Sequence, residues 1–299
     1  LRLKIPKVII GATVVSIGTT FPEVVVSVLA ALQGSPGIAL GNAVGSIICD
    51  TGLIMGLGCI IGTIPLDPKI SKRHGWIQIL SALALVSVSV MGSQVSELTL
   101  NGGRIHQLGG WFLLLLLFGY LYLSTGWAKE ARSTSTAPLH HEGLKEVSSI
   151  KITFKLLSIL VLLGISSEVL ITTASEVALR FGIPESIIAI SMVAVGTSFP
   201  ELITVITAVR KGHGEIALGN IVGADILNAL LVAGAASALT PGGLNVHPSF
   251  FTRSFPMMLL ILGVFRVGTL LSKDTLKKPV GYILLGLWVA ITWMNIGGG

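Results

Sequence analysis

Charged residues are scarce in this sequence: Asp, Glu, Lys and Arg make up 11% of the chain, and hydrophobic residues make up 52%. Soluble domains usually carry about 25% charged residues. Because the apolar residues form long unbroken runs, the composition excludes an ordinary soluble domain. Continuous runs, as opposed to alternating residues, favour membrane-spanning helices over a β-barrel. No cleavable signal peptide is visible.

Cysteine is almost absent too. The two cysteines, Cys49 and Cys59, fall within one apolar segment. We interpret them as packing residues, in preference to a disulfide or a pair of metal ligands.

Nine apolar segments approach the length of about 20 residues that a helix needs to cross a bilayer. They are 8–32, 38–61, 76–91, 108–127, 156–178, 186–209, 216–239, 255–271 and 280–296. Lys and Arg gather in alternate connections, and the connections on the other side hold only Arg104, Arg180 and Arg253. By the positive-inside rule, residue 1 is expected inside the cell and the C-terminus outside. A net charge of +6 can indicate a protein that binds nucleic acid, but here membrane orientation explains where the basic residues lie.

The chain contains two copies of one unit. Positions 1–52 align with 179–230 without a gap, at a spacing of 178 residues, and 22 positions are identical. The matching helices are five segments apart, an odd number, so the copies are expected to enter the membrane from opposite faces. Inverted repeats of this kind are typical of secondary transporters, which hold their substrate between the copies near the midplane.

We therefore divide the chain into a first half at 1–127, a cytoplasmic linker loop at 128–155 and a second half at 156–299. The second copy is preceded by the segment 156–178, for which the first copy shows no equivalent. The sequence predicts an all-α polytopic membrane protein with nine visible spans and a tenth, the first, missing.

Ionisable side chains within a span cost about 2.5–3.5 kcal/mol each on insertion scales, so they are candidates for function. Four carboxylates occupy similar depths in the two copies: Glu23, Asp50, Glu201 and Asp225. A fifth, Glu168, lies in 156–178; it could gate a pathway or bond to a local partner.

Each copy also contains a predicted helix break beside its glutamate. Pro22 and Pro200 have no N–H, so the carbonyls of Gly18 and Gly196 lose their helical partners. Carbonyl, hydroxyl and carboxylate oxygens are the ligands of hard cations such as calcium, and sodium should suit a similar set. Hydroxyls at the two breaks come from Thr19, Thr20, Thr197 and Ser198.

The following helix of each copy adds further oxygen ligands: Asn42, Ser46 and Asp50 in the first, and Asn220, Asp225 and Asn228 in the second. Residues three or four apart share a helical face, so these groups are expected to join one oxygen-rich site.

Several of these residues also have a simpler structural interpretation. Gly45 and Gly223, in the Gly-x-x-x-Gly spacings, are suited to close helix packing. Each Pro-Glu pair could be a mere kink, although its recurrence argues against that. Asp225 could pair with a polar neighbour and bind nothing. His140 and His141 are interpreted as solvated loop residues.

With these motifs the chain resembles the cation/calcium antiporter superfamily, in particular its prokaryotic sodium/calcium exchangers. The family's repeats carry Gly-Thr-Ser-x-Pro-Glu followed by Gly-Asn-x-x-Gly-Ser. The corresponding residues here are 18–23 with 41–46 and 196–201 with 219–224. The resemblance covers nearly the whole chain by the order of its spans.

The resemblance implies a ten-helix fold with four clustered cation sites. Their side-chain ligands would be Glu23, Glu201, Asp50, Asn228, Thr20, Ser198 and Ser46. It also implies that calcium moves against several sodium ions, and that 156–178 and the missing first span slide as a gate.

Two departures bear on stoichiometry. The family's archaeal prototype has Asn in the first copy and Asp in the second, where this chain has Asp50 and Asn228. Ala224 replaces an expected serine, and Asp225 stands where relatives often carry Asn. The number of sodium sites and a use of potassium therefore stay open.

The sequence predicts a non-enzymatic antiporter with calcium, sodium and the lipid bilayer as partners, no cofactor and a monomeric state. A calcium antiporter driven by protons is the main alternative, although Gly45 and Gly223 occupy positions where such proteins typically carry Glu. A channel and an intramembrane hydrolase with paired carboxylates are further alternatives. No His-Glu-x-x-His metal motif supports the hydrolase.

Overall fold

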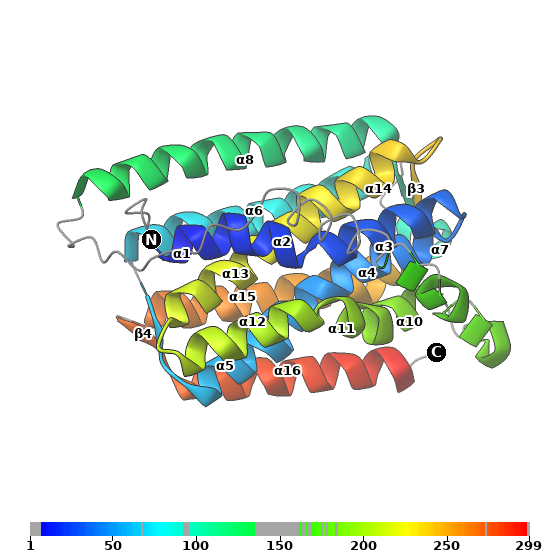
Figure 1. The fold of residues 1–299 in the computed structure, drawn as a ribbon. Helices are drawn as coiled ribbons and strands as arrows, with labels where there is room; N and C mark the ends of the chain where they lie inside the picture. Colours follow the sequence, from blue (N-terminus) through cyan, green and yellow to red (C-terminus); the bar gives the residue numbers. More distant parts are fainter. Residues whose placement is uncertain are drawn as a thin grey trace.

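The computed structural model describes residues 7–66, 68–91, 96–134, 162, 165–166, 169–174, 176–177, 179–182, 185–272 and 274–297. These residues form a bundle of helices with two short strand pairs. The long helices run roughly along one common direction (Figure 1).

The first broken helix consists of α1 (Lys7–Ile10), the π-helical turn η1 (Gly11–Val15), α2 (Ser16–Thr19) and α3 (Phe21–Leu32). The axis bends by 43° between α2 and α3. Pro22 lies in the first turn of α3, where its missing N–H costs the new helix nothing, although it ends the preceding one. The predicted break is therefore present.

The second copy repeats this pattern with α10 (Glu185–Ile188), η3 (Ala189–Val193), α11 (Ala194–Thr197) and α12 (Phe199–Arg210). Here the bend is 53°. All of these boundaries follow those of the first copy at the 178-residue spacing found in the sequence. In Figure 1, α1 to α3 run from left to right, whereas α10 to α12 run from right to left.

Each broken helix is followed by a long buried one. The first consists of α4 (Pro36–Cys49), η2 (Asp50–Ile54) and α5 (Met55–Ile61). The second consists of α13 (Gly214–Leu227), η4 (Asn228–Val232) and α14 (Ala233–Leu239). In both copies the π-helical turn begins at a candidate ligand, Asp50 or Asn228.

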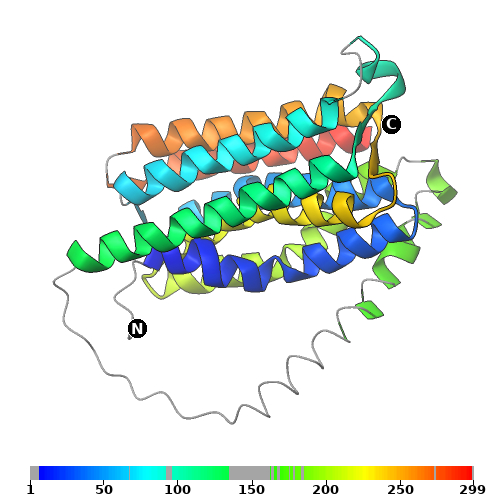
Figure 2. The same ribbon diagram turned by 90° about the horizontal axis from the view of Figure 1, so that it is seen from above.

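The remaining helices surround this core. They are α6 (Pro68–Val90), α7 (Leu98–Asn101), α8 (Gln107–Thr134), η5 (Phe250–Ser254), α15 (Phe255–Leu271) and α16 (Lys278–Gly297). Helix α8 packs along α6 and α14, and α15 lies beside α6 (Figure 2). α16 lines the opposite side and packs on α5.

Two antiparallel strand pairs join the halves at opposite ends of the bundle. Strand β1 (Ile64–Pro65) pairs with β4 (Thr275–Leu276), with Ile64 opposite Leu276. Strand β2 (Gly103–Ile105) pairs with β3 (Leu244–Val246), with Arg104 opposite Asn245.

The number of spans differs from the sequence-based count among the described residues. Five helices are long and apolar enough to cross a membrane: Pro36–Ile61, Lys72–Val90, Gln107–Glu130, Gly214–Leu239 and Phe250–Leu271. The two bent pairs raise the number to seven, and Lys278–Met294 is a shorter apolar helix. Most of 156–178 lies outside the described residues, so the nine spans and the missing tenth stay predictions.

Glycines let the two copies approach closely. A Cβ on Gly223 would lie 2.6 Å from the backbone oxygen of Ala12, and one on Gly45 would lie 2.6 Å from the Cα of Ile190. Each long buried helix therefore packs against the broken helix of the other copy. This confirms the packing interpretation of both glycines. Cys49 and Cys59 are buried free thiols.

Candidate cation-binding site

The two glutamates of the broken helices are fully buried and interact with the opposite copy. Glu23 and Glu201 each lie in the first turn after a break, and neither exposes surface. The hydroxyl of Ser198 donates to Glu23 Oε1 at 3.3 Å, and that of Thr20 donates to Glu201 Oε1 at 3.4 Å. The hydroxyl at each break thus reaches the carboxylate of the other copy, which brings both breaks to one place.

A second reciprocal pair of contacts also joins the two copies. Thr197 Oγ1 donates to Asn42 Oδ1 at 2.8 Å, and Thr19 Oγ1 donates to Asn220 Oδ1 at 3.3 Å. The amide nitrogen of Asn42 also donates to the carbonyl of Glu23 at 3.3 Å and to Ser27 Oγ at 3.0 Å. Asn42 therefore holds the broken helix of its own copy and contacts that of the other.

Several buried polar atoms at or near these contacts have no hydrogen-bond partner among the residues that the structure describes. They are Glu23 Oε2, Glu201 Oε2, both carboxylate oxygens of Asp50, the hydroxyl oxygen of Ser46 and both amide atoms of Asn228. Buried polar atoms in folded proteins are nearly always hydrogen-bonded or bound to water or an ion. The donor set fits hard cations, because almost all of these atoms are oxygens.

The charge of the site is strongly negative when its carboxylates are ionised. When they are ionised, Glu23 and Glu201 repel each other, and Asp50 is repelled by Glu201, Asp225 and Glu23. Burying uncompensated charges in a medium of low dielectric constant is costly. A bound cation would relieve both the repulsion and the loss of hydration.

Most of the predicted site residues are buried. Glu23, Glu201, Asp50, Asn228, Thr20, Ser198, Ser46, Asn42, Asn220, Asp225 and Thr197 are all buried. Thr19 is partly exposed, and Gly18 and Gly196 are exposed. Within the part of the chain that the structure describes, no group of three His, Cys, Asp or Glu side chains is arranged to hold a metal ion. A cation here would therefore depend on hydroxyl, amide and backbone oxygens as well.

Asp225 has partners that the sequence did not indicate. Its Oδ2 accepts from Thr51 Oγ1 at 2.5 Å and from Gln78 Nε2 at 2.5 Å. These contacts agree with the interpretation that Asp225 pairs with polar neighbours. Sequence reasoning missed Gln78 because α6 lies outside the repeated unit.

Arg266 was missed as well, although the sequence contains a signal for it. All other Lys and Arg residues lie outside the nine apolar segments, whereas Arg266 lies inside 255–271 and is only 5% exposed. Glu168, His140 and His141 fall outside the described residues.

Comparison with known proteins identifies relatives over nearly the whole chain. The family model for "Sodium/calcium exchanger protein" matches residues 1–126 and 151–297. "Inner membrane protein YrbG" of Escherichia coli strain K12 is 34% identical, over 97% of this chain and 88% of that protein. "Sodium/calcium exchanger MaX1" of Methanosarcina acetivorans is 28% identical, over 97% of this chain and 89% of that protein.

A solved structure shows the same fold. The sodium-calcium exchanger NCX_Mj, soaked with Na⁺ and Sr²⁺, matches with a TM-score of 0.66 and 25% identity, over 97% of this chain and 87% of that chain. The protein thus has the fold of a multi-pass membrane transporter, and the resemblance found in its sequence is confirmed. The chain belongs to the sodium/calcium exchanger protein family.

Proposed function

We propose that this protein is a secondary antiporter that exchanges calcium for sodium by alternating access at one site between its two copies. The observation that carries this proposal is the reciprocal pair of contacts between Ser198 and Glu23 and between Thr20 and Glu201. Family membership and the matched fold support it.

The proposed ligands are the buried oxygens that lack a hydrogen-bond partner among the described residues, together with the hydroxyls of the breaks. Glu23 and Glu201 form the centre, Asp50 and Asn228 come from the neighbouring helices, and Thr20, Ser198 and Ser46 complete the set. Gly18, Gly196, Thr19 and Thr197 would contribute from the breaks themselves. Asn42 and Asn220 accept hydrogen bonds from Thr197 and Thr19, so we assign them to positioning these threonines.

Coupling follows from charge compensation. One calcium ion or several sodium ions can neutralise the carboxylates of Glu23, Glu201 and Asp50. An empty site would leave these charges uncompensated near the midplane, which disfavours movement of the unloaded carrier between its two faces. Each ion must bind the inward-open and outward-open states with different affinity if it is to shift the balance between them.

The test is calcium-45 uptake into proteoliposomes that carry an outward sodium gradient. We expect Glu23→Gln and Glu201→Gln each to abolish sodium-driven uptake, because the amide removes the charge and keeps the shape. Glu97→Gln, an exposed acid at the start of α7, is the control and should transport normally. Exchange that survives in both Glu23→Gln and Glu201→Gln would contradict the assignment.

The identity of the counter-ion is determined by measuring calcium uptake with a different ion gradient in each experiment. Calcium uptake should follow a sodium gradient and fail with potassium or protons alone. Uptake driven by a pH gradient without sodium would favour the proton-coupled alternative. The tight contacts of Gly45 and Gly223 with backbone atoms of the other copy leave no space there for a proton-accepting side chain.

A further inference from the structure

The fourth buried carboxylate, Asp225, stands apart from the symmetry of the site. At the repeat spacing its counterpart is Ile47, and the counterpart of its partner Thr51 is Ala229. Asp225 is 1% exposed and accepts hydrogen bonds from Thr51 and Gln78 on the same oxygen. The first copy therefore has no carboxylate at this position. The residues that donate to Asp225 take no part in the reciprocal contacts between the broken helices.

A buried cation lies in the same region of the bundle. Arg266 on α15 donates from Nη2 to the carbonyl of Lys72 at 3.3 Å, and its guanidinium lies 4.9 Å from the centre of the Trp76 ring. A Cβ on Gly75 would lie within van der Waals overlap of Arg266 Nη1. The absence of a side chain at Gly75 thus makes room for the guanidinium against α6.

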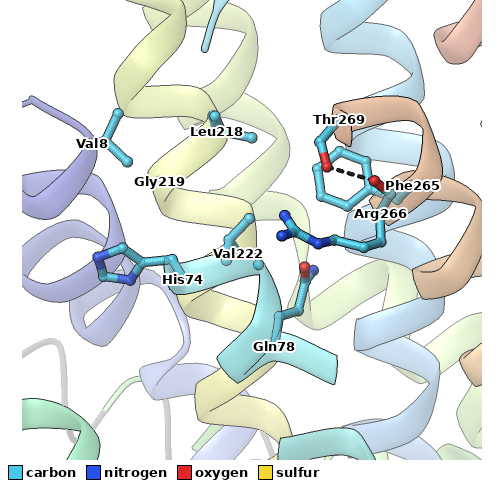
Figure 3. A pocket seen from close by; sticks show the side chains of 10 residues that line it. Val8, His74, Gln78, Leu218, Gly219, Val222, Phe265, Arg266 and Thr269 are labelled. Atoms are coloured by element: carbon cyan, nitrogen blue, oxygen red, sulfur yellow. Dashed lines mark hydrogen bonds between the residues drawn. The ribbon is translucent and has the colours of Figure 1, made fainter. Parts of the chain in front are cut away.

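Gln78 lies between these two charged groups. It follows Gly75 by three residues on α6, and helical side chains lean toward the N-terminus of their helix, which directs the Gln78 amide toward Arg266. Figure 3 shows the amide of Gln78 directed toward the Arg266 side chain, whose guanidinium extends past it. Both line one cavity of about 10 Å³, roughly the space of a single water molecule.

The orientation of the Gln78 amide matches the charges on its two sides. Its nitrogen donates to Asp225 Oδ2, and its buried oxygen has no hydrogen-bond partner among the described residues. The positive end of the amide dipole therefore faces the carboxylate, while the negative end faces the cavity that contains the guanidinium. An amide polarised in this way favours charge on both neighbours.

We propose that Arg266, acting through Gln78, supplies the compensating positive charge for Asp225. On this reading, which rests on the proposed exchange function, the transported cations balance only Glu23, Glu201 and Asp50. Arg266 and Gln78 are then positioning residues that set how many monovalent ions accompany each calcium ion. Asp225 is a fixed internal charge and not a ligand that is filled and emptied in every cycle.

The proposal is tested by the ratio of sodium-22 to calcium-45 flux in proteoliposomes. Arg266→Gln leaves Asp225 uncompensated, so the ratio should rise by about one sodium ion per calcium ion, because an uncompensated buried charge is disfavoured. Asp225→Asn should lower the ratio by about the same amount. The double variant Asp225→Asn/Arg266→Gln should return to the wild-type ratio, and Arg266→Lys should keep it.

Arg73→Gln is the matched control. Arg73 is also on α6, but it is partly exposed and pairs with Glu130 at 2.7 Å, so its removal should not change the flux ratio. An Arg266→Gln ratio equal to that of the wild type would overturn the proposal. So would a double variant whose ratio is no closer to the wild-type value than that of either single variant.

A measurement that needs no transport separates this proposal from the exchange function. In detergent, the melting temperature of the double variant should fall by less than the sum of the decreases seen in the two single variants. The reason is that the second substitution removes the charge that the first left unpaired. Gln78→Leu should weaken this coupling. If the decreases in melting temperature of the two single variants simply added up in the double variant, the proposed compensation of Asp225 by Arg266 would be contradicted. Absence of sodium-driven calcium flux in the wild type would instead refute the exchange function.

Discussion

At the scale of single residues, the site depends on which oxygen atoms lie near each carboxylate. Glu23 accepts a hydrogen bond from Ser198 and Glu201 accepts one from Thr20, and each keeps one buried oxygen with no hydrogen-bond partner in the described part of the chain. The hydroxyls of Thr20 and Ser198 have two roles, since each orients a carboxylate and can itself coordinate a cation. Removing one should weaken cation binding without abolishing it.

We expect Ser198→Ala to lower the apparent calcium affinity roughly tenfold or more. A hydrogen bond to a charged group contributes about 1.5–3 kcal/mol, and about 1.4 kcal/mol corresponds to a factor of ten. Calcium-45 binding at several concentrations measures the change. The control is Ser89→Ala, because the buried hydroxyl of Ser89 donates to the carbonyl of Leu85 within α6, at 2.8 Å. Equal affinities for Ser198→Ala and the wild type would remove Ser198 from the site.

At the scale of helices, the approach of α13 to the first broken helix decides whether the two breaks can face each other. A Cβ on Gly223 would lie 2.6 Å from Ala12 O and 2.6 Å from Ser16 Oγ. Real Cβ atoms do not approach a backbone oxygen so closely, so a larger residue must push the helices apart. The separation would also disturb the hydroxyl–carboxylate contacts between the copies.

Gly223→Ala should therefore destabilise the protein by about 1–3 kcal/mol, the usual cost of overpacking. Gly263→Ala is the matched control on α15, because nothing lies within 4 Å of the added Cβ. It should be neutral or stabilise by about 0.5–1 kcal/mol, since alanine is favoured over glycine within a helix. Thermal unfolding in detergent compares the two, and a Gly223→Ala variant as stable as Gly263→Ala would argue against close packing as the reason for this glycine.

At the scale of the whole molecule, the two ends of the bundle differ in charge. At one end, where β1 and β4 pair, the described basic residues include Lys7, Lys72, Arg73, Arg210, Lys211, Lys277 and Lys278. Of these, Lys7 contacts Glu215 at 3.7 Å and Arg73 pairs with Glu130. At the other end, where β2 and β3 pair, Arg104 donates to Asn245. We propose that the basic end faces the cytoplasm, in accordance with the positive-inside rule.

Cysteine labelling tests this orientation. Lys211→Cys should react with a membrane-impermeant maleimide only in inside-out vesicles, and Arg104→Cys only in right-side-out vesicles or intact cells. Both positions are exposed, and background labelling should be low because Cys49 and Cys59 are buried. Reaction of both variants from the same side would exclude the proposed orientation.

The sequence by itself determined the positions of the helix breaks and the buried acids. Proline removes the helical hydrogen bond to the carbonyl four residues before it and kinks or breaks a helix, so the breaks beside Glu23 and Glu201 were predictable from local chemistry. The repeat spacing likewise predicted the shared element boundaries of the two copies. The family followed from the same motifs, because they recur at a fixed separation.

Only the tertiary structure decided which side chains meet across the copies. The pairs of Ser198 with Glu23 and of Thr20 with Glu201 join residues far apart in the chain, and sequence spacing cannot specify such contacts. The same holds for Asp225, whose partner Gln78 lies on a helix outside the repeat, and for Arg266, which reaches α6 from α15. Local chemistry sets where a helix breaks, but the packing of helices against one another sets which charges share a buried space.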